Sequence, residues 1–123
     1  MILIDTSALI GCLTGPRRSL PKLREIVASG EEIGISSLVL YEWLRGPRTQ
    51  EELTDQEAIL PTERQWGFSA AEATKAADLY RRFPRARGRE IDIAIAATAI
   101  ARDARLWTLN PEDFHDIEGL QLV

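Results

Sequence analysis

The chain opens with MILIDTSALI (residues 1–10), in which an unbroken apolar run ends on Asp5 and is followed by the hydroxyl residues Thr6 and Ser7. A short continuous apolar run is typical of a strand covered on both faces, as in a parallel sheet. A carboxylate directly after such a strand either caps the next helix or binds something at the sheet edge. The choice depends on whether other carboxylates reach the same edge.

Length and composition are those of one ordinary globular domain. The chain has 123 residues, of which 45% are hydrophobic and 28% charged, and we expect a single domain over residues 1–123. Cys12 is the only cysteine, so no disulfide can form within the chain. Asp5 interrupts the opening apolar run, and no span reaches the roughly 20 apolar residues needed to cross a bilayer. We therefore expect a cytoplasmic protein that does not bind membranes.

The charge is acidic overall and basic locally. With 19 acidic and 15 basic residues the formal net charge is −4, which argues against a passive nucleic-acid coat. Five arginines fall within RRFPRARGR (residues 81–89). Such a patch is compatible with phosphate contacts, and equally with a solvated loop or a partner-binding surface.

Strands alternate with helices along the sequence, which predicts an α/β fold: a three-layer α/β/α sandwich with a mostly parallel central sheet. Ser36 or Ser37 is expected to cap the third helix, and Ser69 with Glu72 fits a capping box that opens the fifth. The expected strands are 1–4, 32–36, 65–68, 106–109 and 120–123, and the expected helices are 6–13, 20–29, 37–45, 49–60, 70–83 and 90–101.

Acidic residues follow or flank several of these elements at one edge. In open parallel sheets, ligands bind beyond the carboxyl ends of the strands. Asp5 follows the first strand, and Asn110 and Asp113 follow the strand LWTL. Asp92 stands in the first turn of an apolar, alanine-rich helix, and Glu42 interrupts another apolar helix between two aromatic residues. Each acid alone could be a cap, a dipole partner or a turn residue, but together they predict one acidic site.

Such a cluster is costly unless something neutralises it. Two carboxylates ~4 Å apart repel by about 4 kcal/mol at an effective dielectric constant near 20, so they protonate, move apart or hold a cation. Carboxylate oxygens without His or thiolate ligands favour Mg²⁺ or Mn²⁺ over Zn²⁺. Apart from these four acids, the chain has 15 acidic and 15 basic residues and is formally neutral.

Four segments resemble the PIN-domain ribonucleases, in particular the VapC-like toxins of toxin–antitoxin pairs. ILIDTSALI is similar to the family's opening strand with its first Asp, and SLVLYEWLRG to the helix that carries its Glu. DIAIAATAIA resembles the D-x-x-I-A-A-x-A helix, and TLNPEDF resembles the T-x-N-x-x-D-F ending. The segments occur in the family's order and span nearly the whole chain.

The resemblance implies a Mg²⁺-dependent endoribonuclease, with Mn²⁺ able to substitute, that hydrolyses RNA phosphodiester bonds as the toxin of a toxin–antitoxin pair. It implies a small VapB-like antitoxin and a toxin homodimer as partners. The matching positions are Asp5, Glu42, Asp92 and Asp113 as catalytic or metal-binding acids, with Thr6, Thr108 and Asn110 as supporting neighbours.

The sequence departs from the family in one place, because an Arg often follows the Thr of TLN. That phosphate contact is therefore missing or comes from the arginine loop, through Arg85, Arg87 and Arg89. Glu90 is interpreted as a solvated acid at the start of its helix.

Two other classes of protein are compatible with parts of this pattern. A PIN-like fold that binds RNA or protein without catalysis would share every motif, and a metal-dependent cleavage assay separates the two. A signalling receiver domain usually has adjacent acids after its first strand and a late lysine. Here Thr6 follows Asp5, and Lys22 and Lys75 are the only lysines. Neither Cys12 nor His115 has an evident partner for nucleophilic catalysis.

Overall fold

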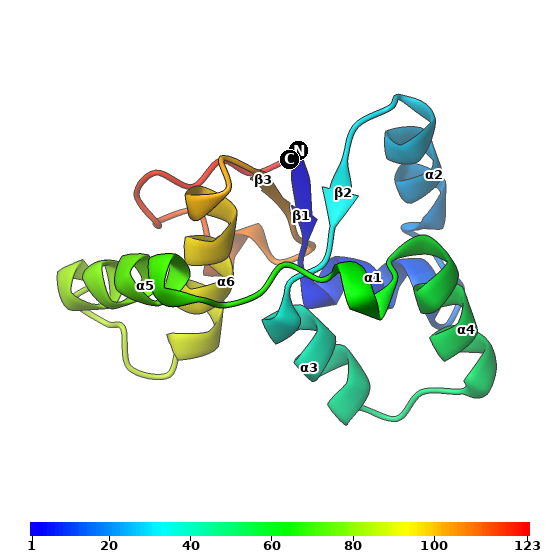
Figure 1. The fold of residues 1–123 in the computed structure, drawn as a ribbon, viewed down its shortest axis with the longest axis horizontal. Helices are drawn as coiled ribbons and strands as arrows, with labels where there is room; N and C mark the ends of the chain where they lie inside the picture. Colours follow the sequence, from blue (N-terminus) through cyan, green and yellow to red (C-terminus); the bar gives the residue numbers. More distant parts are fainter.

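A three-stranded parallel sheet forms the centre of the molecule. The computed structural model describes residues 1–123, and its strands β1 (Ile2–Ile4), β2 (Ile33–Gly34) and β3 (Arg105–Trp107) lie in the order β2-β1-β3. Figure 1 shows β1 between its two neighbours. All of β1 is buried, as its continuous apolar run predicts.

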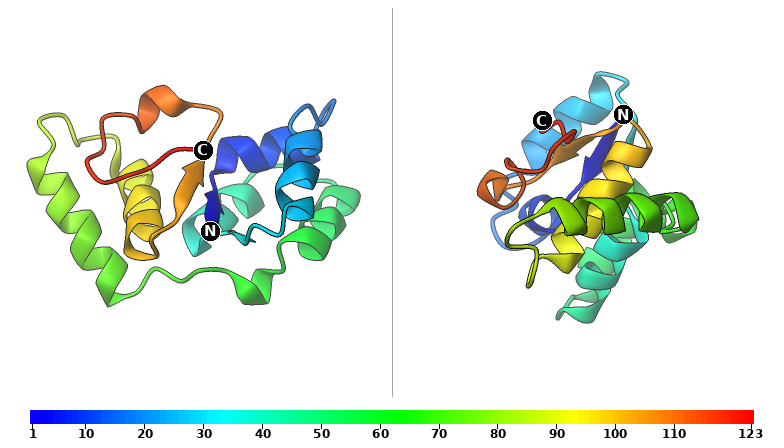
Figure 2. Two further views of the ribbon diagram at one scale, coloured as in Figure 1. Left: turned by 90° about the horizontal axis from the view of Figure 1, so that it is seen from above. Right: turned by 90° about the vertical axis from the view of Figure 1, so that its left-hand side faces the viewer.

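Helices cover the sheet on both sides, which confirms the predicted α/β sandwich. Helices α5 and α6 lie on one side of the strands and the other four helices lie on the opposite side (Figures 1 and 2). The elements outside the sheet are α1 (Thr6–Leu13), α2 (Leu20–Ala28), α3 (Ser37–Arg45), α4 (Gln50–Ile59), α5 (Ala70–Arg82), α6 (Glu90–Ala101) and the short 3₁₀ turns η1 (Thr62–Arg64) and η2 (Pro111–Asp113).

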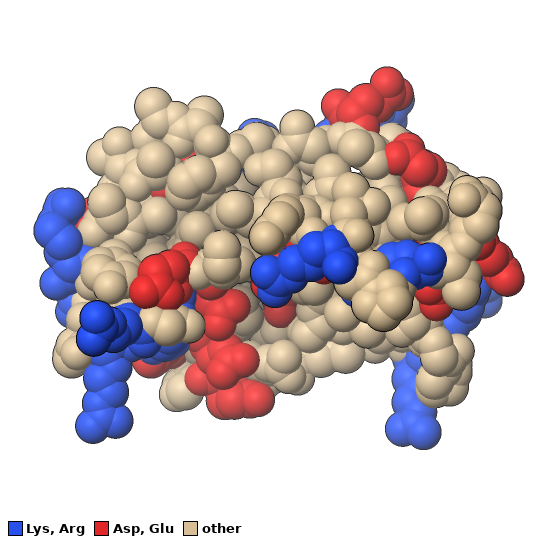
Figure 3. All heavy atoms as spheres, turned by 90° about the horizontal axis from the view of Figure 1, so that it is seen from below, with Lys and Arg blue, Asp and Glu red and all other residues tan.

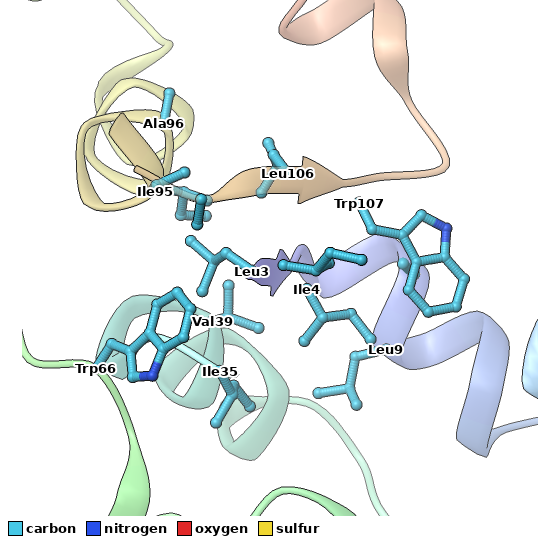
Figure 4. Packing of buried hydrophobic residues seen from close by; sticks show 14 of the residues in the cluster. Leu3, Ile4, Leu9, Ile35, Val39, Trp66, Ile95, Ala96, Leu106 and Trp107 are labelled. Atoms are coloured by element: carbon cyan, nitrogen blue, oxygen red, sulfur yellow. The ribbon is translucent and has the colours of Figure 1, made fainter. Parts of the chain in front are cut away.

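The core runs through the sheet from one helical layer to the other. Leu3 of β1 lies between Ile95 of α6 and Val39 of α3, as Figure 4 shows. Every residue of α6 from Ile93 to Ala99 is buried, and its alanines allow α5 and β3 to approach closely. The core therefore fixes α6, and with it Asp92, relative to β1.

Two of the predicted helix caps have different outcomes. Ser36 caps α3, since its Oγ accepts from the amide of Val39 at 3.1 Å. The capping box predicted at Ser69 and Glu72 is wrong, because the Ser69 hydroxyl donates to the Glu72 carboxylate at 2.9 Å and caps no backbone amide. Glu72 is buried, and a buried carboxylate requires a donor.

A capping box does form at α4, from a T-x-x-E pattern at residues 49–52 that our sequence analysis missed. Thr49 accepts from the amide of Glu52 at 3.1 Å, and the Glu52 carboxylate accepts from the amide of Thr49 at 2.8 Å. This reciprocal pairing satisfies two amides that a helix N-terminus would otherwise leave free.

Two predicted strands are reduced to single bridges, and the strand expected over 32–36 spans only Ile33–Gly34. Residues 65–68 contribute one bridge, between Trp66 and Ser36, and residues 120–123 contribute one, between Leu122 and Leu106. The first segment is confined between η1 and α5, and the second follows a turn at Gly119 with φ +85°, so neither has room for a longer ladder. None of the helices combines the length and apolarity needed to span a membrane.

The close approach of Gly34 to Trp66 generates a stability prediction. A Cβ atom at Gly34 would lie 2.3 Å from Cε2 of Trp66, which is too close for any real contact. We expect Gly34→Ala to lower the free energy of unfolding by about 1–3 kcal/mol through overpacking, as measured by urea denaturation. Gly67→Ala is the matched control, because a Cβ there meets nothing within 4 Å. Equal losses in both variants would contradict this explanation.

Candidate active site

Asp5 occupies the N-cap position of α1, but its carboxylate does not cap the helix. Its amide donates to the carbonyl of Trp107 at 2.8 Å, which extends the pairing of β1 with β3 by one residue. The side chain makes no capping hydrogen bond, and the residue is only 5% exposed. A carboxylate buried this deeply needs other donors.

Two hydroxyl groups supply those donors. Thr108, the first residue after β3, donates to Oδ2 of Asp5 at 2.7 Å, and Ser7 donates to the same oxygen at 2.9 Å. The Ser7 hydroxyl in turn accepts from the amide of Leu109 at 3.0 Å. The ends of two strands thus converge on one carboxylate, whose second oxygen makes no hydrogen bond within the chain.

Glu42 is positioned by α3. It lies on α3, and the Thr6 hydroxyl at the start of α1 donates to its Oε1 at 2.6 Å. Its other oxygen lies 3.5 Å from the guanidinium of Arg45. The three consecutive residues of the DTS motif therefore have three functions, in which Asp5 supplies a carboxylate, Thr6 orients Glu42 and Ser7 orients Asp5.

The pKa of Asp92 indicates that the four acids lie near one another. Burial, followed by the charges of Asp5, Asp113 and Glu42, raises the pKa of Asp92 from 3.8 to about 6. The nearby guanidinium of Arg89 acts in the opposite direction. The site thus carries more negative charge than its surroundings neutralise.

Asp113 ends η2 on the exposed side of the site. Its amide donates to the carbonyl of Asn110 at 3.0 Å, and the amide of Asn110 donates to Thr108 at 3.0 Å. Asn110 therefore contributes its backbone to this turn. No side-chain hydrogen bond or ion pair engages the Asp113 carboxylate.

The donor set consists of carboxylate and hydroxyl oxygens, the ligand chemistry that Mg²⁺ and Mn²⁺ prefer. No group of three or more His, Cys, Asp or Glu side chains has an arrangement that could hold a metal ion. The electrostatic and chemical properties of the site fit a divalent cation, since the added positive charge would offset the charges of Asp5, Asp113 and Glu42, which after burial raise the pKa of Asp92.

The predicted basic residues differ in their surroundings. Arg85 and Arg87 are exposed and form no ion pair. Arg89 is engaged, because its guanidinium donates to both carboxylate oxygens of Asp116 at 2.9 and 2.8 Å. Glu90 accepts from the amide of Gly88 at 3.1 Å and so holds the loop before α6.

The face at the carboxyl ends of the strands carries both acidic and basic side chains. Figure 3 views the molecule from below, toward the carboxyl ends of the strands, and acidic side chains lie there with Lys and Arg on both sides of them. Such a pattern allows a polyanion to reach an acidic site between flanking basic groups.

Comparison with known proteins assigns the chain to a family. Residues 2–120 match the family model described as PIN domain. The chain belongs to the PIN-domain family. This PIN domain is 35% identical to Ribonuclease VapC19 of Mycobacterium tuberculosis, strain H37Rv, over 124 aligned residues that cover 98% of each chain. The family resemblance predicted from the four sequence segments is therefore confirmed.

Solved structures share the fold of this PIN domain. VapBC2 from Rickettsia felis, bound to a DNA fragment from its promoter, aligns with a TM-score of 0.76 and 25% identity, covering 100% of this chain and 98% of that one. DNA-bound VapBC from Salmonella typhimurium aligns with a TM-score of 0.75 over 99% and 96% of the two chains, and at 20% identity it supports the fold alone.

The raised pKa of Asp92 predicts how stability depends on pH. The folded PIN domain binds the Asp92 proton more tightly than the unfolded chain does, so stability falls as pH rises from about 4 to about 6 and the penalty persists above that. In metal-free buffer, Asp92→Asn should therefore raise the Tm at pH 7.5 by about 3–6 °C, equivalent to roughly 1 kcal/mol, and the gain should vanish near pH 4.

Glu90→Gln is the control of opposite sign. Backbone hydrogen bonds lower the pKa of Glu90, so its charge stabilises the fold at neutral pH, and its removal should not raise the Tm there. Thermal melting between pH 4 and pH 8 compares both variants with the wild type. A gain for Asp92→Asn that is independent of pH would show that the cost of ionising Asp92 is not its cause.

Proposed function

We propose that this chain is a Mg²⁺-dependent endoribonuclease, with Mn²⁺ able to substitute, and acts as the toxin of a toxin–antitoxin pair in the cytoplasm. The observation that carries the proposal is the meeting of four acids, from the end of β1 and from α3, α6 and η2, at the carboxyl edge of the sheet, where burial and then the charges of its neighbours raise the pKa of Asp92. The relative that aligns over 98% of both chains is named a ribonuclease, which supports RNA as the substrate.

Asp5, Glu42, Asp92 and Asp113 are the residues that would hold the cation. When bound, it would lower the pKa of the attacking water and stabilise charge on the leaving oxygen. The hydroxyls of Ser7, Thr108 and Thr6 hold two of these acids in fixed orientations, so little reorganisation is needed when RNA binds.

Asp113 is the better candidate to accept a proton from the attacking water. Glu42 has one oxygen bonded to Thr6 and the other beside Arg45, whereas Asp113 is exposed and its carboxylate makes no hydrogen bond within the chain. A free carboxylate at the open side of the site can reach a water and release the proton to solvent. We therefore assign the base to Asp113 and an orienting role to Glu42.

Arg85 and Arg87 are proposed to contact the RNA backbone. Both are exposed and without an ion-pair partner, and Arg85 lines a hollow of about 420 Å³ beside Phe83 and Arg89. Phosphate contacts by such side chains position a strand without reading its sequence.

A small VapB-like antitoxin and a second copy of this chain are the proposed protein partners. The structures it resembles are described as VapBC complexes, which supports the antitoxin. Large apolar side chains are exposed on α3, α5 and α6, and such groups are commonly covered by a partner; they include Tyr41, Leu44, Tyr80 and Ile91.

Cleavage of RNA by the purified chain tests the catalytic proposal. We expect cleavage with Mg²⁺ or Mn²⁺ that stops in excess EDTA, and Asp5→Asn should reduce the rate at least 100-fold, because it removes the most buried of the four charges. Asp103→Asn, a change at an exposed acid outside the site, should cleave as the wild type does. Undiminished cleavage in EDTA would refute the metal mechanism and favour another catalytic centre.

The salt dependence of RNA binding tests the arginine loop. Replacing Arg85 and Arg87 with Gln should weaken RNA binding and reduce the slope of log K against log salt by about 0.7 for each phosphate that is no longer neutralised. Binding can be measured in EDTA, so that no RNA is cleaved. An unchanged slope would assign the loop to a protein interface instead.

A further inference from the structure

Arg89 stands where helix electrostatics disfavour it. It is the N-cap residue of α6, and its side chain caps no backbone amide. A positive charge at a helix N-terminus opposes the helix dipole, and Arg is not a preferred N-cap residue. Contacts elsewhere must therefore explain its position.

Those contacts reach η2 and the turn that follows it. The guanidinium donates to both carboxylate oxygens of Asp116 and, at 2.7 Å, to the backbone carbonyl of Asp113. Arg89–Asp116 is the only ion pair in the structure in which one guanidinium binds both oxygens of one carboxylate, and Arg89 is the least exposed of the paired arginines, at 23%. Most exposed ion pairs contribute little, but this bidentate geometry is the exception.

The same guanidinium also contacts the end of α5. It lies 4.8 Å from the centroid of the Phe83 ring, over which it can make a cation–π contact. One side chain therefore joins the end of α5, the start of α6 and the turn η2.

Residues 111–117 make no other polar contact with the body of the molecule, although Asn110 before them contacts Thr108 and Glu118 after them pairs with Arg82. Every other hydrogen bond of residues 111–117 is made within residues 110–120. Phe114 and Ile117 are buried, so apolar packing anchors the segment, but packing alone does not fix the direction of the Asp113 backbone. The bond from Arg89 to the Asp113 carbonyl does so.

We propose that Arg89 is a positioning residue, which fixes Asp113 relative to Asp92 by bridging the start of α6 to η2. The inference rests on the proposed function, because it assigns Arg89 to the geometry of the acidic site rather than to the RNA. Asp92 lies three residues after Arg89 on the buried α6, so the bridge links the helix that carries Asp92 to the turn that carries Asp113.

Two variants break the bridge from its two ends. Arg89→Lys keeps the charge but loses the planar fork that binds a carboxylate and a carbonyl together, and Asp116→Asn removes one charged acceptor while leaving Arg89 intact. We expect each to lower kcat for RNA cleavage about 10-fold, to leave KM within twofold, and to raise the Mn²⁺ concentration for half-maximal activity about 10-fold. The double variant should lose no more than the more severe single variant, since both remove one interaction.

Thermal melting gives a readout that does not depend on catalysis. The increase in Tm caused by Mn²⁺ should be smaller in both variants than in the wild type, because metal binding stabilises the native state more when its affinity is higher. Arg105→Lys is the matched control: it changes an exposed Arg that also binds a carboxylate, that of Glu31, at the opposite end of β3. It should change none of these quantities.

The outcomes separate the alternatives. A raised KM with unchanged kcat and an unchanged Mn²⁺ response in Arg89→Lys would make Arg89 an RNA contact and overturn the proposal. Additive losses in the double variant, or wild-type behaviour of Asp116→Asn, would also overturn it. A wild-type chain that binds Mn²⁺ but cleaves no RNA would refute the proposed nuclease and leave the bridge to be decided by the melting curves.

Discussion

The hydrogen bond between the Thr108 hydroxyl and the Asp5 carboxylate is the contact on which the site depends. It joins the residues that directly follow two neighbouring parallel strands. The register of the sheet therefore determines where the Asp5 carboxylate lies. The register is fixed by a fully buried central strand, in which a slip would expose apolar side chains. The position of Asp5 is consequently as firmly determined as that of the core residues.

The acidic site lowers the stability of the protein that carries it. Asp5 is buried with two hydroxyl donors and no basic side chain paired with it, and Asp92 lies in the first turn of a helix that is otherwise largely apolar. Structures keep such groups where function requires them and offset their cost elsewhere. Here the offset comes from the apolar cluster around β1, from the close packing of α5 on α6 and from caps such as that of Ser36.

The sequence predicted the fold and the location of the acids, because both follow from local patterns. An apolar run, a helical period and the rule that ligands bind beyond strand ends are sufficient to bring Asp5 and Asp113 together. The role of Ser7 was missed, although a hydroxyl two residues after an Asp is a known local hydrogen-bond pattern. Arg89 was grouped with Arg85 and Arg87 by composition, and only the folded turn shows that Asp116 engages it. Ser69 and Glu72 had the right spacing for a capping box, but Glu72 is buried, and the Ser69 hydroxyl donates to its carboxylate instead of accepting from a backbone amide.

Two elements of the site, α6 and η2, differ in local stability, because α6 is buried without interruption from Ile93 to Ala99. Amides in such a helix exchange with solvent mainly when the whole protein unfolds, whereas an exposed turn such as η2 opens in smaller and more frequent fluctuations. Helix α6 therefore keeps its conformation between catalytic cycles, while η2 can open locally. A substrate strand would enter and leave past the side that carries Asp113, and the side that carries Asp92 would serve as the fixed reference.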